Sequence, residues 1–133
     1  RFGDPETEVV LPLLESDAYD VFYGIATGQL AMGDGQLAWR NEATIGVVLA
    51  SKGYPGDYAK GAVIEGVELF DGPVFHMGTK NDNGVLKTNG GRVMMCIATG
   101  KDIAAAQEKV YAEIAKIKCD NLFYRKDIAH WAL

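Results

Sequence analysis

The chain of 133 residues has few of the residues that build disulfide frameworks or metal centres, since it contains two cysteines and two histidines. Cys96 and Cys119 lack the paired spacing of a zinc site, and His76 and His130 lie too far apart to form a ligand pair on one helix. The sequence therefore predicts no disulfide framework and no metal site of this kind. Because Cys96 follows the apolar residues 93–95, we expect it to be a buried free thiol.

An excess of positive charge and a long apolar run are also missing. The net charge is −5 and the isoelectric point is about 4.9, which argues against a nucleic-acid partner. The apolar runs fall well short of the roughly 20 residues of a membrane span, so we expect no membrane partner. Free cysteines are consistent with a reducing cytoplasm. The chain opens on Arg1 rather than methionine, from which we expect a fragment of a longer polypeptide.

Helix signals appear near both ends of the chain. Residues 6–15 predict a short helix that is interrupted near Pro12, and a second helix is expected to begin after Asp17 and to stop at Gly24 or Gly28. After Asp102, a plausible N-cap, an apolar stripe at spacings of three and four predicts a third helix. The stripe consists of Ile103, Ala106, Val110, Ile114 and Ile117.

Strand signals lie between these helices. Extended segments are predicted at residues 44–50, 62–70, 74–79, 84–88 and 92–99. The Asn83-Gly84 step is a strong hairpin signal between two of them. Helices followed by mostly consecutive strands and then a helix predict an α+β fold rather than repeated βαβ units.

Four stretches rich in glycine or cations lie at the expected ends of these elements. Loops at such positions can converge on one face, where backbone N–H groups are free to meet an anion. None of the four is a phosphate-binding P-loop or a dinucleotide fingerprint, and any one alone is weak evidence. They cover residues 1–6, 51–56, 75–79 and 89–92.

Taken in this order, and together with Arg125-Lys126-Asp127-Ile128-Ala129, the stretches resemble the C-terminal part of the phosphoribosylamine–glycine ligase family. The resemblance implies that residues 1–30 end an ATP-grasp domain and that residues 31–133 form the C-terminal domain. It implies an α+β fold in which helices precede a small, mostly antiparallel β domain with one packed helix. That domain would be similar to a rudimentary single-hybrid or barrel-sandwich motif.

The resemblance also implies an activity. Members of the family join glycine to 5-phosphoribosylamine in de novo purine synthesis, using ATP and Mg²⁺ or Mn²⁺ and passing through glycyl phosphate. By resemblance the metal ligands lie just upstream of Arg1, so we expect none in this chain. We therefore expect these residues to pack against missing ATP-grasp lobes and to be inactive alone. The alternatives are a stand-alone phosphosugar-binding module and the equivalent domain of another purine-pathway ligase.

Lys52 and Arg92 are the strongest candidates for binding the 5′-phosphate, because an ammonium and a planar guanidinium both suit phosphate oxygens. Gly53 and Gly91 lie beside them and would let the backbone approach. The spacing alone favours two solvated surface cations beside turn glycines, and the family resemblance reverses this preference in favour of phosphate binding. Tyr54 and His76 are further candidates for contacts with the substrate, although packing would also explain both side chains.

Arg1 and Asp4 are the candidates for a catalytic role. By resemblance Arg1 lies close to the γ-phosphate of ATP and to glycyl phosphate, where a cation would stabilise developing negative charge. Asp4 would bind the glycine ammonium or orient Arg1, and it could instead cap the helix that starts near Pro5. The chain departs from the family pattern at Glu8, a usual glutamine, at Met77, a usual alanine, and at Ala129, a usual glycine.

Overall fold

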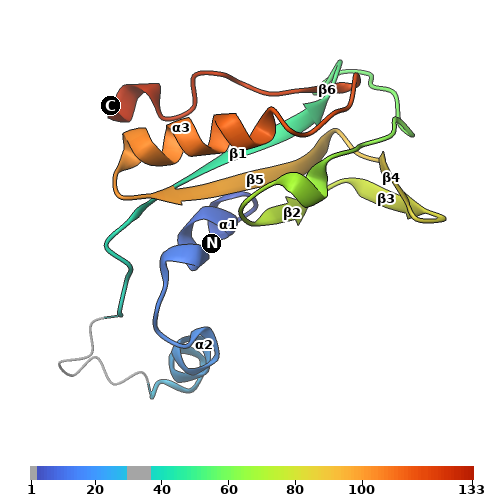
Figure 1. The fold of residues 1–133 in the computed structure, drawn as a ribbon. Helices are drawn as coiled ribbons and strands as arrows, with labels where there is room; N and C mark the ends of the chain where they lie inside the picture. Colours follow the sequence, from blue (N-terminus) through green and yellow to red (C-terminus); the bar gives the residue numbers. More distant parts are fainter. Residues whose placement is uncertain (1–2, 30–36) are drawn as a thin grey trace.

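A four-stranded antiparallel sheet lies at the centre of the computed structural model, which describes residues 3–29 and 37–133 (Figure 1). The strand order is β2-β5-β1-β6. Its long members, β1 and β5, run side by side from Ala43 opposite Gly100 to Ala50 opposite Arg92. The strands of this sheet are β1 (Ala43–Ser51), β2 (Val74–His76), β5 (Arg92–Gly100) and β6 (Leu122–Phe123), and β3 (Thr79–Asp82) and β4 (Val85–Thr88) form a separate hairpin.

The helices occupy the positions at which the sequence places caps and breaks. Asp17 accepts hydrogen bonds from the N–H groups of Tyr19 and Asp20, and Gly28 ends that helix with a φ of 67°. Within the described part of the chain, no helix is long and apolar enough to cross a membrane. The α-helices are α1 (Glu6–Val10), α2 (Ala18–Thr27) and α3 (Ile103–Ile114), and the 3₁₀-helices are η1 (Leu11–Leu13), η2 (Val67–Leu69) and η3 (His130–Ala132).

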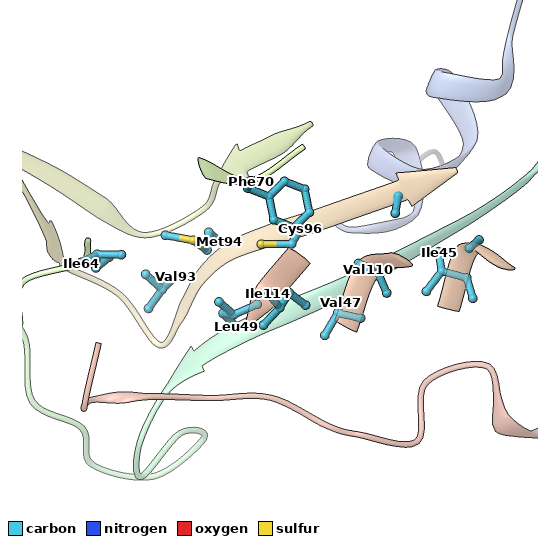
Figure 2. Close-up of a cluster of buried hydrophobic side chains, with 12 residues drawn as sticks. Ile45, Val47, Leu49, Ile64, Phe70, Val93, Met94, Cys96, Val110 and Ile114 are labelled. Carbon is cyan, nitrogen blue, oxygen red and sulfur yellow. The ribbon is translucent and has the colours of Figure 1, made fainter. Parts of the chain in front are cut away.

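The core fills the space between the sheet and α3 (Figure 2). Asp102 caps α3 by accepting from the N–H of Ala105, and the helix then buries its apolar stripe against β1 and β5. Cys96 is a fully buried thiol, as expected, and burial raises its pKa to about 12. The core residues are Ile45, Val47, Leu49, Ile64, Phe70, Val93, Met94, Cys96, Ala98, Ala106, Val110 and Ile114.

Most of the expected elements are confirmed, including the antiparallel α+β class and the hairpin at Asn83-Gly84, where both residues have positive φ. The strand predicted over residues 62–70 is wrong. This segment makes only isolated bridges at Val63 and Glu65 and then enters η2. The cause lies at Gly66, which turns the chain with a φ of 78° and lies against the backbone of Lys116.

The face of the sheet opposite α3 receives α1. Gly46 on β1 makes this approach possible, because an added Cβ would collide with Met95 Cε and would lie 2.7 Å from Val9 Cγ1. Helix α1 therefore packs directly on β1 and β5, and the residues just before it reach the start of β5. In Figure 1, α1 lies beside the sheet while α2 stands apart from it.

Glu8 on α1 has a buried polar atom that this packing leaves without a hydrogen bond from the residues that the structure describes. Its Oε2 atom is buried and has no hydrogen-bond partner among the described residues. Burial raises the pKa of the Glu8 carboxyl, the neighbouring Asp4 raises it further, and Arg92 opposes both. The fold thus holds a carboxylate at a place that favours its neutral form.

The α3 packing predicts that Ile114→Asp abolishes cooperative unfolding. Ile114 is 2% exposed, and a charge at its place would lose the apolar burial and add an unpaired buried carboxylate, a cost of about 4 kcal/mol or more. Circular dichroism melts provide the measurement. Ala112→Asp is the matched control, because Ala112 is exposed on the same helix and the change there costs about 0.7 kcal/mol. A normal melt for Ile114→Asp would contradict the packing.

The Glu8 environment predicts that Glu8→Gln stabilises the fold at neutral pH, raising the melting temperature by about 1–4 °C. In the folded protein the pKa of the Glu8 carboxyl is raised above its ordinary value of 4.5. The unmutated protein therefore gains stability as the pH falls from neutral through the raised pKa toward 4.5. The advantage of the variant should therefore shrink in melts near pH 4. A lower melting temperature for Glu8→Gln at pH 7 would show that the carboxylate makes a favourable interaction.

Candidate functional site

The four glycine-rich or basic stretches meet around residues 89–92, at the start of β5. The N–H of Asn89 donates to the carbonyl oxygen of Gly78 at 2.8 Å, which joins the third stretch to the fourth. Ser51 donates to Gly90 and Gly91 through its hydroxyl and its N–H, both at 2.8 Å, which adds the second stretch. The first stretch arrives through Asp4. The sheet thus brings together segments that are far apart in sequence.

Asp4 and Arg92 form a two-pronged ion pair. Nη1 of Arg92 lies 3.2 Å from Oδ1 of Asp4, Nη2 lies 3.3 Å from Oδ2, and Nη1 also donates to the Asp4 carbonyl oxygen at 3.3 Å. The two side chains are 58% and 39% exposed, respectively, so the pair is worth about 1 kcal/mol or less. An anion with better geometry can therefore displace Asp4 at small cost.

The expected helix cap at Asp4 is not formed. Pro5 occupies the N-cap position of α1 without a side-chain cap, and the Asp4 carboxylate turns to Arg92 instead. Arg1, the other catalytic candidate, lies outside the described residues. The roles assigned to Arg1 and Asp4 stay predictions.

The glycines of the site have neighbours within the protein. A Cβ on Gly91 would collide with the ring of Tyr54, and one on Gly53, whose φ is 99°, would collide with the carbonyl oxygen of Asp57. A Cβ on Gly78 would lie 2.8 Å from Cα of Gly90. The sequence suggested that such glycines let the backbone approach an anion, whereas in the structure they let the loops pack on one another.

Tyr54 forms the wall of the site next to Gly91. Its ring packs on Gly91 and meets the ring of Tyr58 edge to face, with the ring centres 6.3 Å apart. Tyr54 remains 38% exposed, which leaves part of the ring free to contact a ligand. Packing and ligand contact are therefore compatible for this side chain.

Lys52 and His76 lie at the edge of the site rather than in it. The N–H of Lys52 donates to the carbonyl oxygen of Asn121 at 2.9 Å, and its exposed side chain pairs with no carboxylate in the described part of the chain. Nδ1 of His76 lies 2.9 Å from Oγ1 of Thr79, on the edge strand β2. His76 is thus an exposed side chain with a polar partner.

A pocket of about 310 Å³ opens beside Arg92. Apolar and aromatic side chains form most of its wall, and Arg92 and Arg125 also line it. A second pocket of about 210 Å³ shares Pro5, Val48 and Arg125 with it, so the two form one groove along β1. The residues that line the first pocket are Pro5, Val48, Ala50, Tyr54, Arg92, Phe123, Tyr124 and Arg125.

Sequence reasoning missed the side of this pocket that residues 123–125 provide. Arg125 belongs to a stretch that the family resemblance had already singled out, but no role was assigned to it. A larger pocket, of about 570 Å³, lies at the other end of β1 near Lys101 and Leu133, and none of the predicted site residues line it. Residues 3–29 and 37–133 offer no group of three or more metal-ligating side chains.

Several known proteins that are similar to this chain share one name. Phosphoribosylamine–glycine ligase from Halalkalibacterium halodurans is 49% identical over 135 residues, and that from Pseudomonas aeruginosa is 45% identical over 136 residues. Each match covers 100% of this chain and 31% of the relative. The crystal structure of phosphoribosylamine–glycine ligase from Thermotoga maritima matches 96% of this chain and 31% of its own, with a TM-score of 0.77 and 35% identity.

This chain thus spans about a third of the length of the relatives that it matches. The fold agrees with that comparison, since a small antiparallel sheet covered by helices is shared with the Thermotoga maritima structure. A model of the phosphoribosylglycinamide synthetase C domain matches residues 44–131, which is more than half of the chain, and the chain therefore belongs to that family.

Proposed function

We propose that these residues are the C-terminal part of an ATP-dependent ligase that joins glycine to 5-phosphoribosylamine and produces glycinamide ribonucleotide. In this proposal they bind the phosphosugar and form part of the rim of the active site. The observation that carries it is the meeting of all four predicted stretches at Arg92, beside a pocket with aromatic and cationic walls. The names of the similar proteins support the same assignment.

The proposed reaction requires neither a general base nor a metal ligand from this chain. ATP would transfer its γ-phosphoryl group to the glycine carboxylate, and the amine of phosphoribosylamine would attack the resulting acyl phosphate and release inorganic phosphate. The amine is already a nucleophile, so His76 is not needed as a general base. We assign the binding of ATP and of Mg²⁺ or Mn²⁺ to the rest of the ligase, because the family resemblance places the metal ligands just upstream of Arg1.

Arg92 would contribute by exchanging one anionic partner for another. A phosphate offers more oxygens and more charge than the Asp4 carboxylate, and the planar guanidinium can hold it through two hydrogen bonds. The exposed Asp4–Arg92 pair gives up little free energy when it opens. Lys52 would add a second positive charge from the neighbouring loop, and Tyr54, seated on Gly91, would contact the sugar.

Asp4 and Arg1 would act on the other substrates. An Asp4 carboxylate released from Arg92 is suited to the ammonium group of glycine. Arg1 would lie near the phosphoryl group in transfer and stabilise its charge. When the phosphate replaces Asp4 at Arg92, the Asp4 carboxylate would become free to bind glycine. Binding of the phosphosugar would therefore favour binding of glycine.

Helix α2 supports the proposal that the rest of the ligase packs on this chain. Tyr19, Phe22, Tyr23 and Ile25 are all exposed, and the rings of Tyr19 and Tyr23 stack with centres 5.7 Å apart. A helix with apolar side chains on its outer side is typical of a buried contact. We propose that the ATP-grasp lobes, which would fill the remaining length seen in the relatives, cover this face.

Two further parts of the assignment remain proposals. The division into residues 1–30 and 31–133 falls within residues 30–36, which lie outside the described part of the chain. We place the ligase in the cytoplasm, where the unpaired thiols of Cys96 and Cys119 would stay reduced.

Arg92→Ala in the full-length ligase is expected to raise the KM for phosphoribosylamine about tenfold or more and to leave the KM for ATP within about threefold. Lys52→Ala should raise this KM less, because Lys52 lies at the edge of the site, and Arg92→Lys should recover only part of the loss, because a point charge cannot replace the guanidinium fork. Steady-state kinetics provide the measurement. Arg40→Ala, at an exposed arginine outside the pocket, is the control. An unchanged KM for phosphoribosylamine in Arg92→Ala would mean that Arg92 is only a surface cation.

These 133 residues alone are expected to show no ligase turnover and no ATP hydrolysis above background. The reason is that the proposal places the ATP and metal sites in the rest of the ligase. A coupled assay of ADP release, run beside the full-length enzyme as the positive control, tests this. ADP release by the purified chain in proportion to its concentration would place an ATP site within these residues.

A further inference from the structure

The segment that follows β6 has almost no regular structure, yet α3 holds it firmly. The hydroxyl of Tyr111 donates to the carbonyl oxygen of Arg125 at 2.8 Å and accepts from the N–H of Ile128 at 3.1 Å. Nε2 of Gln107 donates to the carbonyl oxygen of Ile128 at 2.7 Å. The rings of Tyr111 and Tyr124 stack with centres 6.1 Å apart. Figure 1 shows this tail running alongside α3.

Asp127 fixes the direction of the Arg125 side chain. Nε of Arg125 donates to Oδ1 of Asp127 at 2.8 Å, and Nη2 donates to Oδ2 at 2.7 Å. This pairing leaves Nη1 without a partner among the described residues. The same pair lowers the pKa of the Asp127 carboxyl and raises that of Arg125, so both groups stay charged at neutral pH.

Arg125 and Arg92 line the same pocket, although they come from different parts of the fold. Arg92 opens β5 and Arg125 follows β6, and each is held by its own aspartate. Lys52, the second cation expected from the sequence, does not line this pocket. Two arginine side chains on the wall of a mostly apolar pocket suit an anion that offers several oxygens and is attached to a less polar body.

We propose that Arg125 is a second phosphate-binding residue of this site, acting with Arg92, and that Asp127 is its positioning residue. The inference rests on the proposed phosphosugar-binding function and names a further group that recognises the same substrate. The unpaired Nη1 of Arg125 donates to a phosphate oxygen, while Asp127 holds the guanidinium in one orientation by pairing with Nε and Nη2.

A purely structural role for Arg125 explains less of the geometry. The contacts that fasten the tail to α3 use the backbone of Arg125 and Ile128 and the side chains of Tyr111 and Gln107. The Arg125 side chain is 69% exposed, and its partner Asp127 lies only two residues along the chain. Removing the guanidinium should therefore leave the fastening of the tail intact.

The test compares Arg125→Ala, Arg125→Lys and Lys126→Ala in the full-length ligase, with Arg92→Ala alongside. Lys126 is the matched control, because it is an exposed cation next to Arg125 that does not line the pocket. We expect Arg125→Ala to raise the KM for phosphoribosylamine about tenfold, with kcat and the KM for ATP changed less than about threefold. Arg125→Lys should recover part of the loss, and Lys126→Ala should have no effect.

Asp127→Asn separates positioning from packing. We expect a smaller rise in the KM for phosphoribosylamine, about threefold, and no change in melting temperature. Both Arg125→Ala and Asp127→Asn should weaken the binding of ribose 5-phosphate measured by calorimetry on the same full-length proteins.

The outcomes distinguish this inference from the proposed function. If Arg92→Ala weakens phosphosugar binding and Arg125→Ala behaves like Lys126→Ala, the role of Arg125 is wrong and the proposed function stands. If neither arginine affects the KM for phosphoribosylamine or the binding of ribose 5-phosphate, the phosphate site itself is wrong. If Arg125→Ala lowers the melting temperature and kcat while the KM is unchanged, Arg125 is structural and the inference is overturned.

Discussion

The ladder between β1 and β5 is the constraint on which the rest of the structure depends. Six consecutive residues of β5, from Val93 to Ala98, are buried, so this strand has protein on both faces. Helix α3 supplies one covering layer, and α1 supplies the other where Gly46 leaves room for it. A strand fixed on both faces cannot slide without exposing apolar side chains, so its first residue, Arg92, has a defined position.

The site follows from where that ladder ends. At the Arg92 end, β1 passes into the loop that carries Lys52 and Tyr54, and Ser51 ties this loop to Gly90 and Gly91. The packing of α1 on the sheet brings Asp4, which lies near the start of the chain, to Arg92. The glycines make these contacts possible by letting backbone and aromatic ring come close. The same packing that stabilises the fold therefore gathers the charged groups, without requiring a ligand to organise them.

Local signals in the sequence were sufficient for much of this. Asp17, Asp102 and the Asn83-Gly84 turn each act within a few residues, and the structure has helix caps and a hairpin where they predict them. The ordered motifs also indicated the family. The ion pair of Asp4 with Arg92 joins residues 88 positions apart, and no local pattern can reveal such a contact. The strand predicted over residues 62–70 was wrong because an apolar run does not show that Gly66 must turn against Lys116. Arg125 was missed because its pocket exists only once the tail lies on α3.

The central claim is that this domain holds the phosphate of a phosphosugar at the start of β5. A crystal structure of the full-length ligase with glycinamide ribonucleotide bound tests it most directly. The account predicts phosphate oxygens within about 3 Å of the Arg92 guanidinium, with the Asp4 carboxylate displaced from it. A phosphate bound only by groups outside these 133 residues, with Arg92 still paired to Asp4, would contradict the account.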